Sequence, residues 1–121
     1  MAKTLTDKQC ADIFAEAEQA GIERGNGADV GNYKVIDGAK VYDMPDGLCG
    51  FAWVNIKPGN GKFAKWLKQH SLARPDSYYG GVCHWVSRYN QSYERKLAYA
   101  SAFSEVLNKH GIRAYPGSRL D

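Results

Sequence analysis

The chain has 121 residues, of which 44% are hydrophobic and 24% charged, a composition typical of a folded globular protein and unlike that of a disordered or fibrous one. A chain of this length forms one domain, residues 1–121, and buries roughly two-thirds of the surface that it exposes when unfolded. The formal net charge is only +3, and no apolar run approaches the roughly 18 residues of a membrane-spanning helix, so no membrane partner is expected.

The amino-terminal segment MAKTLTDKQC lacks the apolar stretch of a secretory signal, so we expect a cytoplasmic location. The three cysteines, Cys10, Cys49 and Cys83, form no C-x-x-C pair. They predict buried free thiols, and neither a disulfide framework nor a cysteine zinc site. The three histidines have no H-x-x-H or H-x-x-x-H spacing, so no metal and no cofactor is expected.

The charged residues are distributed unevenly. Residues 1–56 contain 5 Lys or Arg and 9 Asp or Glu, a balance of −4, whereas residues 57–121 contain 11 and 4, a balance of +7. A basic second half suits an anionic partner. It suits equally a solvated surface on which two blocks of opposite charge lie side by side.

The first half of the chain predicts a helix followed by three strands. Thr6 and Gln9 have capping-box spacing, apolar residues then recur on one helical face, and Gly21 is expected to end the helix. After a glycine-rich loop, Asp37-Gly38 lies between two β-prone runs and predicts a hairpin. A third strand over residues 48–56 completes a predicted meander.

The second half alternates helices and strands. A short amphipathic helix follows the third strand, with Asn60 as its expected N-cap. A strand is predicted over residues 82–89, a long helix from about Tyr93 to His110, and a last strand over residues 112–115. The predicted order is therefore α-β-β-β-α-β-α-β, an α+β fold with a mostly antiparallel sheet and helices packed on it. Two β-α-β crossovers would make part of that sheet parallel.

Residues 49–121 resemble a family of small uncharacterised proteins of tailed bacteriophages and prophages. The resemblance is carried by WVNIKPG, by YNQS followed by RK, and by a terminal SRLD. That family has no established activity, so the resemblance implies a phage origin, in the infected cell or in the virion, and carries over no catalytic residue.

A second resemblance is to the double-stranded RNA-binding domain, whose helix, three-strand meander and helix match the order predicted for residues 1–71. That domain grips phosphates with lysines at the start of its second helix, where this chain has Lys62 and Lys65. Trp66 and Leu67 depart from the alanine-rich helix of that domain, so the similarity is one of fold alone.

Cys83 and His84 are the first pair to test as nucleophile and base. Consecutive side chains of a strand point to opposite faces, so these two residues cannot form a hydrogen-bonded dyad. No other catalytic motif is present, and we expect a protein that is not an enzyme.

Two predicted strands each have one small aliphatic face and one aromatic, polar face. If helices cover the aliphatic faces, Trp53, Trp85 and Tyr89 form with Lys57 an exposed platform on which bases stack. If helices cover the aromatic faces, these rings are core, which is the commoner use of large aromatics. The aliphatic faces are Ala52, Val54, Ile56 and Val82, His84, Val86, Arg88; the aromatic faces are Phe51, Trp53, Asn55, Lys57 and Cys83, Trp85, Ser87, Tyr89.

Lys96 lies in the middle of the apolar arc of the long helix. Because an unpaired buried ammonium is costly, Lys96 must either extend its amine to solvent or meet an anion. The second alternative predicts a phosphate or carboxylate pocket at the junction before the helix, to which an adjacent last strand would add Arg119. The pocket residues would be Tyr89, Asn90, Gln91, Ser92, Arg95 and Lys96.

These observations favour a non-catalytic binding module for an anionic ligand, either nucleic acid or a nucleotide. The alternative is a protein-interaction or virion-associated component, in which exposed aromatics and arginines bind a host or virion protein. A homo-oligomer is compatible with both. The candidate ligand-binding residues are Trp53, Lys57, Lys62, Lys65, Trp85, Tyr89, Asn90, Gln91, Arg95, Lys96 and Arg119.

Overall fold

The computed structural model describes residues 4–28, 33–37, 40–44, 48–89 and 92–120. Its element order confirms the predicted α+β fold and adds a two-residue strand, β4. The elements are α1 (Asp7–Asn26), β1 (Tyr33–Asp37), β2 (Lys40–Met44), β3 (Gly50–Lys57), α2 (Lys62–Gln69), β4 (Arg74–Pro75), β5 (Val82–Trp85), α3 (Tyr93–Lys109) and β6 (Arg113–Leu120).

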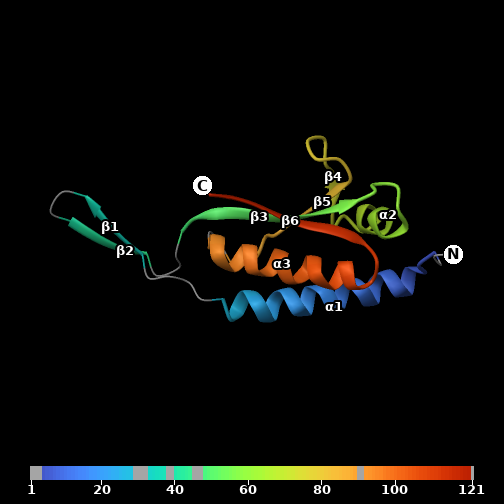
Figure 1. Cartoon of the computed structure of the whole chain (residues 1–121), viewed down its shortest axis with the longest axis horizontal. Coiled ribbons are helices and arrows are strands. Elements are labelled where there is room, and N and C mark those ends of the chain that lie inside the picture. The colour runs from blue at the N-terminus through green and yellow to red at the C-terminus, as the bar shows by residue number, and fades with distance from the viewer. Residues whose placement is uncertain (1–3, 29–32, 38–39, 45–47, 90–91, 121) are drawn as a thin grey trace.

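The main sheet has the strand order β4-β5-β3-β6, and all its pairings are antiparallel. The predicted hairpin of β1 and β2 is confirmed, but it forms a separate two-stranded sheet that projects from the rest (Figure 1). The predicted meander is therefore wrong. The prediction of a mostly antiparallel sheet is confirmed, and the two crossovers do not make any described pairing of this sheet parallel. Because β3 pairs with two strands from the second half, the topology also departs from that of the double-stranded RNA-binding domain.

Helix α3 lies against one face of this sheet, and α1 packs along α3 on that same side (Figure 1). The face that they cover is the aliphatic one, since Ala52, Val54 and Ile56 of β3 are at most 1% exposed. The large rings of the core come from the helices, with Phe103 of α3 fully buried among them. The expectation that the aromatic strand faces are core is therefore wrong. Small aliphatic residues let α3 approach the sheet closely, which leaves the large strand aromatics on the opposite face.

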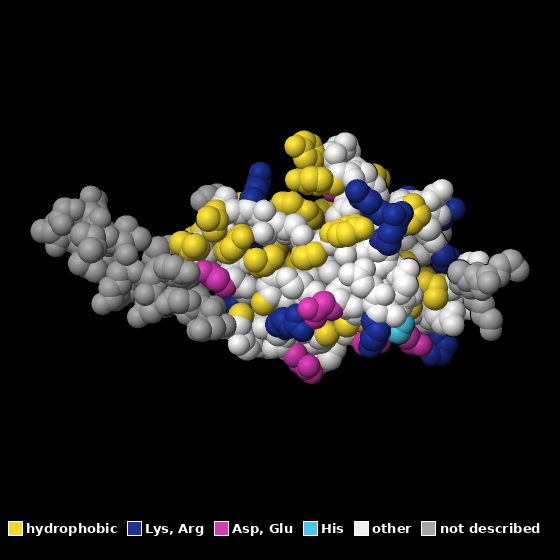
Figure 2. Space-filling view, viewed as in Figure 1, with side chains coloured by type: hydrophobic (Ala, Val, Ile, Leu, Met, Phe, Trp, Pro, Cys, Tyr) yellow, Lys and Arg dark blue, Asp and Glu magenta, His cyan; other side chains and the backbone are white. Residues whose placement is uncertain are grey.

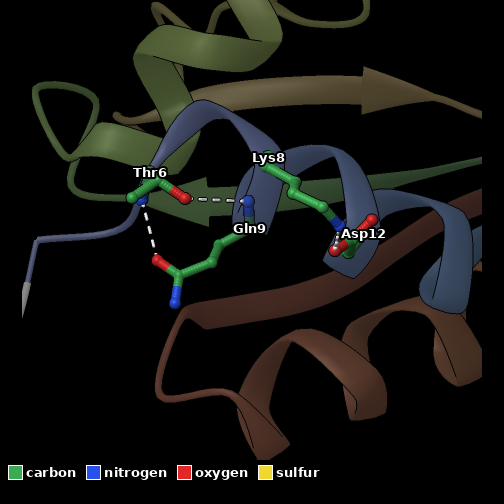
Figure 3. Close-up of polar contacts among 4 residues, drawn as sticks. All are labelled: Thr6, Lys8, Gln9 and Asp12. Atoms are coloured by element: carbon green, nitrogen blue, oxygen red, sulfur yellow. Dashed lines mark hydrogen bonds and ion pairs between the residues drawn. The ribbon is translucent and has the colours of Figure 1, made fainter.

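The predicted capping box at the start of α1 is confirmed (Figure 3). The Gln9 N–H donates to Thr6 Oγ1 at 3.1 Å, and the Thr6 N–H donates to Gln9 Oε1 at 2.8 Å. The predicted end at Gly21 is wrong, because α1 continues to Asn26. An added Cβ at Gly21 would lie 2.8 Å from the Tyr99 ring, so this glycine allows α1 to approach α3 and does not end the helix.

Three other boundaries differ from the prediction. The N-cap of α2 is Gly61 and not Asn60. Strand β5 ends at Trp85, because the chain then leaves the sheet toward α3 and turns at Tyr89, where φ is 69°. Strand β6 continues to Leu120, because the whole length of β3 is available to pair with it.

His84 of β5 is placed inside the fold, and its protonation should affect stability. Its Nδ1–H donates to the Leu72 carbonyl oxygen at 2.6 Å, and its ring stacks on Phe103. Burial lowers the pKa of His84 from its ordinary value of 6.5. Below pH 6.5 the unfolded chain therefore takes up a proton that the folded chain does not, and the free energy of unfolding should fall as the pH decreases toward the lowered pKa. Urea unfolding between pH 7.5 and 5 measures this loss.

The matched variant is His84→Phe, which keeps an aromatic ring against Phe103. Its free energy of unfolding should depend less on pH over the same range, since both proteins share the two other histidines. Identical pH profiles for the two proteins would contradict the assignment.

Candidate functional site

The face of the sheet opposite the helices presents four strand aromatics, Phe51, Trp53, Trp85 and Tyr115. The first three have rings in contact with one another, and we term these three the aromatic face. Trp53 and Trp85 are paired across β3 and β5, and their rings are nearly parallel, with 10° between planes and 5.7 Å between centroids. The Phe51 ring is tilted by 42° against Trp85. Trp85 is 46% exposed, so the rings form a continuous surface that solvent reaches.

The surface around the sheet is apolar and basic, whereas that of α1 is acidic. Figure 2 shows hydrophobic side chains gathered along the sheet side, with Lys and Arg among them, and most acidic side chains on the lower, helical side. Asp7 and Glu16 of α1 are paired with Lys62 of α2 and Lys109 of α3. The acidic and basic blocks of the sequence thus lie side by side where the helices meet. On the aromatic side of the sheet, by contrast, Arg74 and Arg119 have no carboxylate within 4.0 Å in the described part of the chain.

A glycine of β6 determines how the Trp53 ring lies. Gly117 is opposite Trp53 in the β3–β6 ladder, and the indole lies directly over it. A Cβ on Gly117 would be 2.2 Å from Trp53 Nε1, a distance at which the indole must move.

Gly117→Ala should therefore displace the Trp53 indole and disturb the aromatic face while leaving the core intact. We expect a changed tryptophan emission spectrum and a small change in the free energy of unfolding, since the contact is on the uncovered face of the sheet. Gly27→Ala, which adds the same methyl group just after α1 where the nearest atom would be 3.4 Å away, is the control. An emission spectrum of Gly117→Ala identical to that of the unsubstituted protein would contradict this placement of Trp53.

A groove of about 840 Å³ lies beside the aromatic face. Trp53 and Trp85 line it together with the segment between α2 and β5, which includes β4. Two arginines from distant parts of the chain, Arg74 and Arg119, also line it. The groove thus combines exposed aromatic rings with guanidinium groups, which bind phosphates and carboxylates with paired donors. Its full lining is Trp53, residues 71–79, residues 83–85, Ser87 and Arg119.

Lys96 and Arg119 meet at the Phe51 ring. Lys96 Nζ lies 5.4 Å and Arg119 Cζ 5.2 Å from its centroid, distances at which a cation is attracted to a ring. Lys96 is 5% exposed, and no described carboxylate lies within 4.0 Å of it. The structure therefore agrees with neither of the two alternatives for Lys96. Its ammonium forms no ion pair with a described residue, and it does not extend into solvent, because it lies against the Phe51 ring.

Two other predicted site residues lie elsewhere. Arg95 donates from Nη1 to the carbonyl oxygens of Gly25 and Asn26, at 3.0 and 2.9 Å, and so satisfies the end of α1. The Tyr89 hydroxyl donates to the Ile22 carbonyl oxygen at 3.2 Å and to Asn26 Oδ1 at 3.0 Å. Both side chains therefore fasten the junction before α3 to α1 and are not part of the aromatic face. Asn90 and Gln91 lie outside the described residues.

The three predicted lysines line a different depression, of about 660 Å³, around the start of α2. Lys57 and Lys65 lie there with Arg113, whereas the Lys62 ammonium is bound to Asp7 at 2.6 Å. The two depressions share no lining residue. The structure thus separates these lysines from the groove.

Residues of the segment between α2 and β5 were not predicted from the sequence as site residues. Arg74, Tyr78 and Tyr79 line the groove, and Tyr78 and Tyr79 are 84% and 54% exposed. The adjacent tyrosines before Gly80-Gly81 are the only sequence signal, since a turn that presents two aromatic rings to solvent is unusual. Their position depends on the pairing of β4 with β5.

The adjacent Cys83 and His84 do not form a dyad. Cys83 is opposite Asn55 and His84 opposite Val54, so the two side chains lie on different faces of the sheet, as predicted. Burial raises the pKa of the Cys83 thiol, which disfavours the nucleophilic thiolate. Within the described ranges, no three side chains of His, Cys, Asp or Glu are grouped as a metal site would require.

Comparison of the chain with protein-family models, with curated proteins and with solved structures gave no match. Among the described residues, no helix has the length and apolar character needed to span a membrane.

Proposed function

We propose that this protein is a non-catalytic binding module for nucleic acid or a nucleotide, and that the ligand binds at the aromatic face. The observation that supports this most directly is the uncovered pair of parallel indoles, Trp53 and Trp85, beside a groove that Arg74 and Arg119 line. Aromatic rings stack on bases, because every base has a π-face, and arginine neutralises phosphate. Both requirements are met within one groove.

The electrostatics of the groove agree with an anionic ligand. Asp76 is the only carboxylate among its lining residues, and it already accepts three hydrogen bonds within the protein. Lys96 adds a third cation nearby, at the Phe51 ring, where it lies together with Arg119. The local charge around the groove is therefore positive, although the charge of the whole chain is small.

The binding test is fluorescence anisotropy of a labelled oligonucleotide titrated with the purified protein. We expect saturable binding with a dissociation constant of about 10⁻⁶ to 10⁻⁴ M near physiological salt, the range of sequence-independent nucleic-acid binding. Quenching of tryptophan emission should accompany it, since the ligand stacks on indoles. No anisotropy change and no quenching up to about 10⁻⁴ M would reject the proposal.

A second candidate function is binding of another protein. Tyr115 and Leu120 of β6 are 52% and 56% exposed, and exposed tyrosines are common interface anchors. The partner would be a host or virion protein if the chain has the phage origin that its sequence resemblance implies. This candidate is favoured if the oligonucleotide titration fails and the protein runs above its monomer mass on a sizing column.

A further inference from the structure

The turn that joins β4 to β5 is built around one carboxylate. Asp76 Oδ1 accepts hydrogen bonds from the N–H groups of Tyr78 and Tyr79, both at 2.9 Å. Its Oδ2 accepts from Asn55 Nδ2 at 3.2 Å, and the same amide donates to the Gly80 carbonyl oxygen at 2.9 Å. These hydrogen bonds hold the pKa of Asp76 below its usual range, and the bond from the Tyr79 N–H contributes most to that lowering. Because Asn55 is a buried residue of the central strand β3, the turn is fastened to the sheet.

The backbone of this turn is determined by the sequence. Gly80 and Gly81 have φ of 79° and 66°, which other residues rarely adopt, and a Cβ on Gly81 would lie 2.2 Å from the Ile56 carbonyl oxygen. The rings that this backbone carries are nevertheless exposed. Tyr78 and Tyr79 contact each other edge to face, with 4.5 Å between centroids, and neither belongs to the core. A fixed turn that presents two unburied rings at a groove indicates a role in binding.

Aromatic rings from two parts of the fold, the sheet and the turn, line the groove. Trp53 and Trp85 belong to β3 and β5, and Tyr78 and Tyr79 to the turn. Arg74, which also lines the groove, belongs to the short edge strand β4. A ligand that stacks on these rings and pairs with Arg74 needs a free flat face and an anionic group close to that face. An unpaired base with its phosphate has both, whereas in a duplex each base face is covered by its neighbours and proteins read the base edges in the grooves.

We propose that the groove binds a single strand of nucleic acid in preference to a duplex, and that Asp76 is a positioning residue that holds Tyr78 and Tyr79 as its second aromatic wall. This inference rests on the proposed function and adds to it the form of the ligand and a residue that acts through others. With Arg74 and Arg119 as the phosphate contacts, the logarithm of the binding constant should fall with the logarithm of salt concentration with a slope of about −1.4.

The strand preference is tested by titrating the unsubstituted protein against labelled oligothymidylate, oligouridylate and a duplex of the same length. We expect either single strand to bind at least about tenfold more tightly than the duplex, because stacking on aromatic rings is open only to unpaired bases. Equal or tighter binding of the duplex would overturn this inference and leave the proposed function standing. Binding of none of the three would instead reject the proposed function.

The role of Asp76 is tested with Asp76→Asn, which places an amide group opposite the Asn55 amide and so removes one of the three hydrogen bonds. We expect single-strand affinity to fall about fivefold, the low end of the effect of losing one stacking ring. Asp12→Asn, the same chemical change on the exposed surface of α1 and outside the groove, should bind as the unsubstituted protein does. An unchanged affinity of Asp76→Asn would overturn the positioning role.

A double substitution separates positioning from a general loss of structure. Tyr78→Ala with Tyr79→Ala removes only exposed rings and should itself weaken single-strand binding about fivefold or more. Adding Asp76→Asn to that protein should weaken binding no further, since the residue acts through the tyrosines. A further loss would show that Asp76 acts in another way. Should Asp76→Asn fail to fold, full affinity in the tyrosine variant alone would still overturn the second wall.

Discussion

Trp85→Ala is expected to weaken the binding of single-stranded oligonucleotide by about 5- to 150-fold, which corresponds to the roughly 1–3 kcal/mol of one base–aromatic stack. Trp85 is 46% exposed and lies against Trp53, so its removal takes away both a stacking surface and the support of the neighbouring indole. Anisotropy titration of a labelled oligothymidylate measures the loss. The free energy of unfolding should change little, because Trp85 is not part of the core.

Two variants control for this effect. Trp85→Phe keeps a smaller ring and should retain most of the affinity. Lys8→Ala removes a cation from the exposed surface of α1, away from the aromatic face, and should leave binding unchanged. If Trp85→Ala binds as tightly as the unsubstituted protein, the aromatic face is not the site. An equal loss in Lys8→Ala would show that the loss in Trp85→Ala is not specific to the aromatic face.

Phe103→Ala is expected to lower the free energy of unfolding by about 3–5 kcal/mol, a large part of the roughly 5–15 kcal/mol that stabilises a domain. Phe103 is fully buried, and its ring contacts Phe14 of α1, His84 of β5 and Tyr99 of α3, with centroids 4.9 to 5.9 Å apart. One side chain therefore joins both helices to the sheet. Urea unfolding followed by circular dichroism measures the loss.

The control is Phe103→Leu, which keeps most of the buried volume and should cost less than about 1.5 kcal/mol. Equal losses for the two substitutions would mean that the site collapses around either side chain and that no cavity forms. Under conditions where Phe103→Ala remains folded, it should bind oligonucleotide normally, because Phe103 is not one of the residues that line the groove.

The parts of this fold that depend on neighbouring residues were predictable from the sequence. The capping box of Thr6 and Gln9, the extent of α3 and the hairpin of β1 and β2 follow from backbone hydrogen bonds and turn preferences a few residues apart. The separation of Cys83 from His84 follows likewise from strand alternation. Lys96 was recognisable as unusual, because a cation within an apolar arc conflicts with helical periodicity.

The candidate site depended on contacts that no local pattern records. The alternation of residue types divides β3 into two faces but does not indicate which face the helices cover. The covered face is the one whose small residues allow close helix packing. The predictions for Tyr89 and Arg95 were wrong for the same reason, because they depended on contacts between distant segments. Tyr89 was predicted on the aromatic face and instead packs on α1, and Arg95 binds the end of that helix.

The amino-acid sequence by itself determined the element types, the aromatic and aliphatic faces of β3 and β5, and the surplus of cations in the second half. Only the tertiary structure decided that the aromatic face is uncovered, that Arg74 and Arg119 reach one groove, and that Asp76 fastens two exposed tyrosines to Asn55. The reason is physical: periodicity and capping arise within a few residues, whereas the groove joins β3, β5, β6 and a turn whose neighbourhood exists only once antiparallel pairing has brought these segments together.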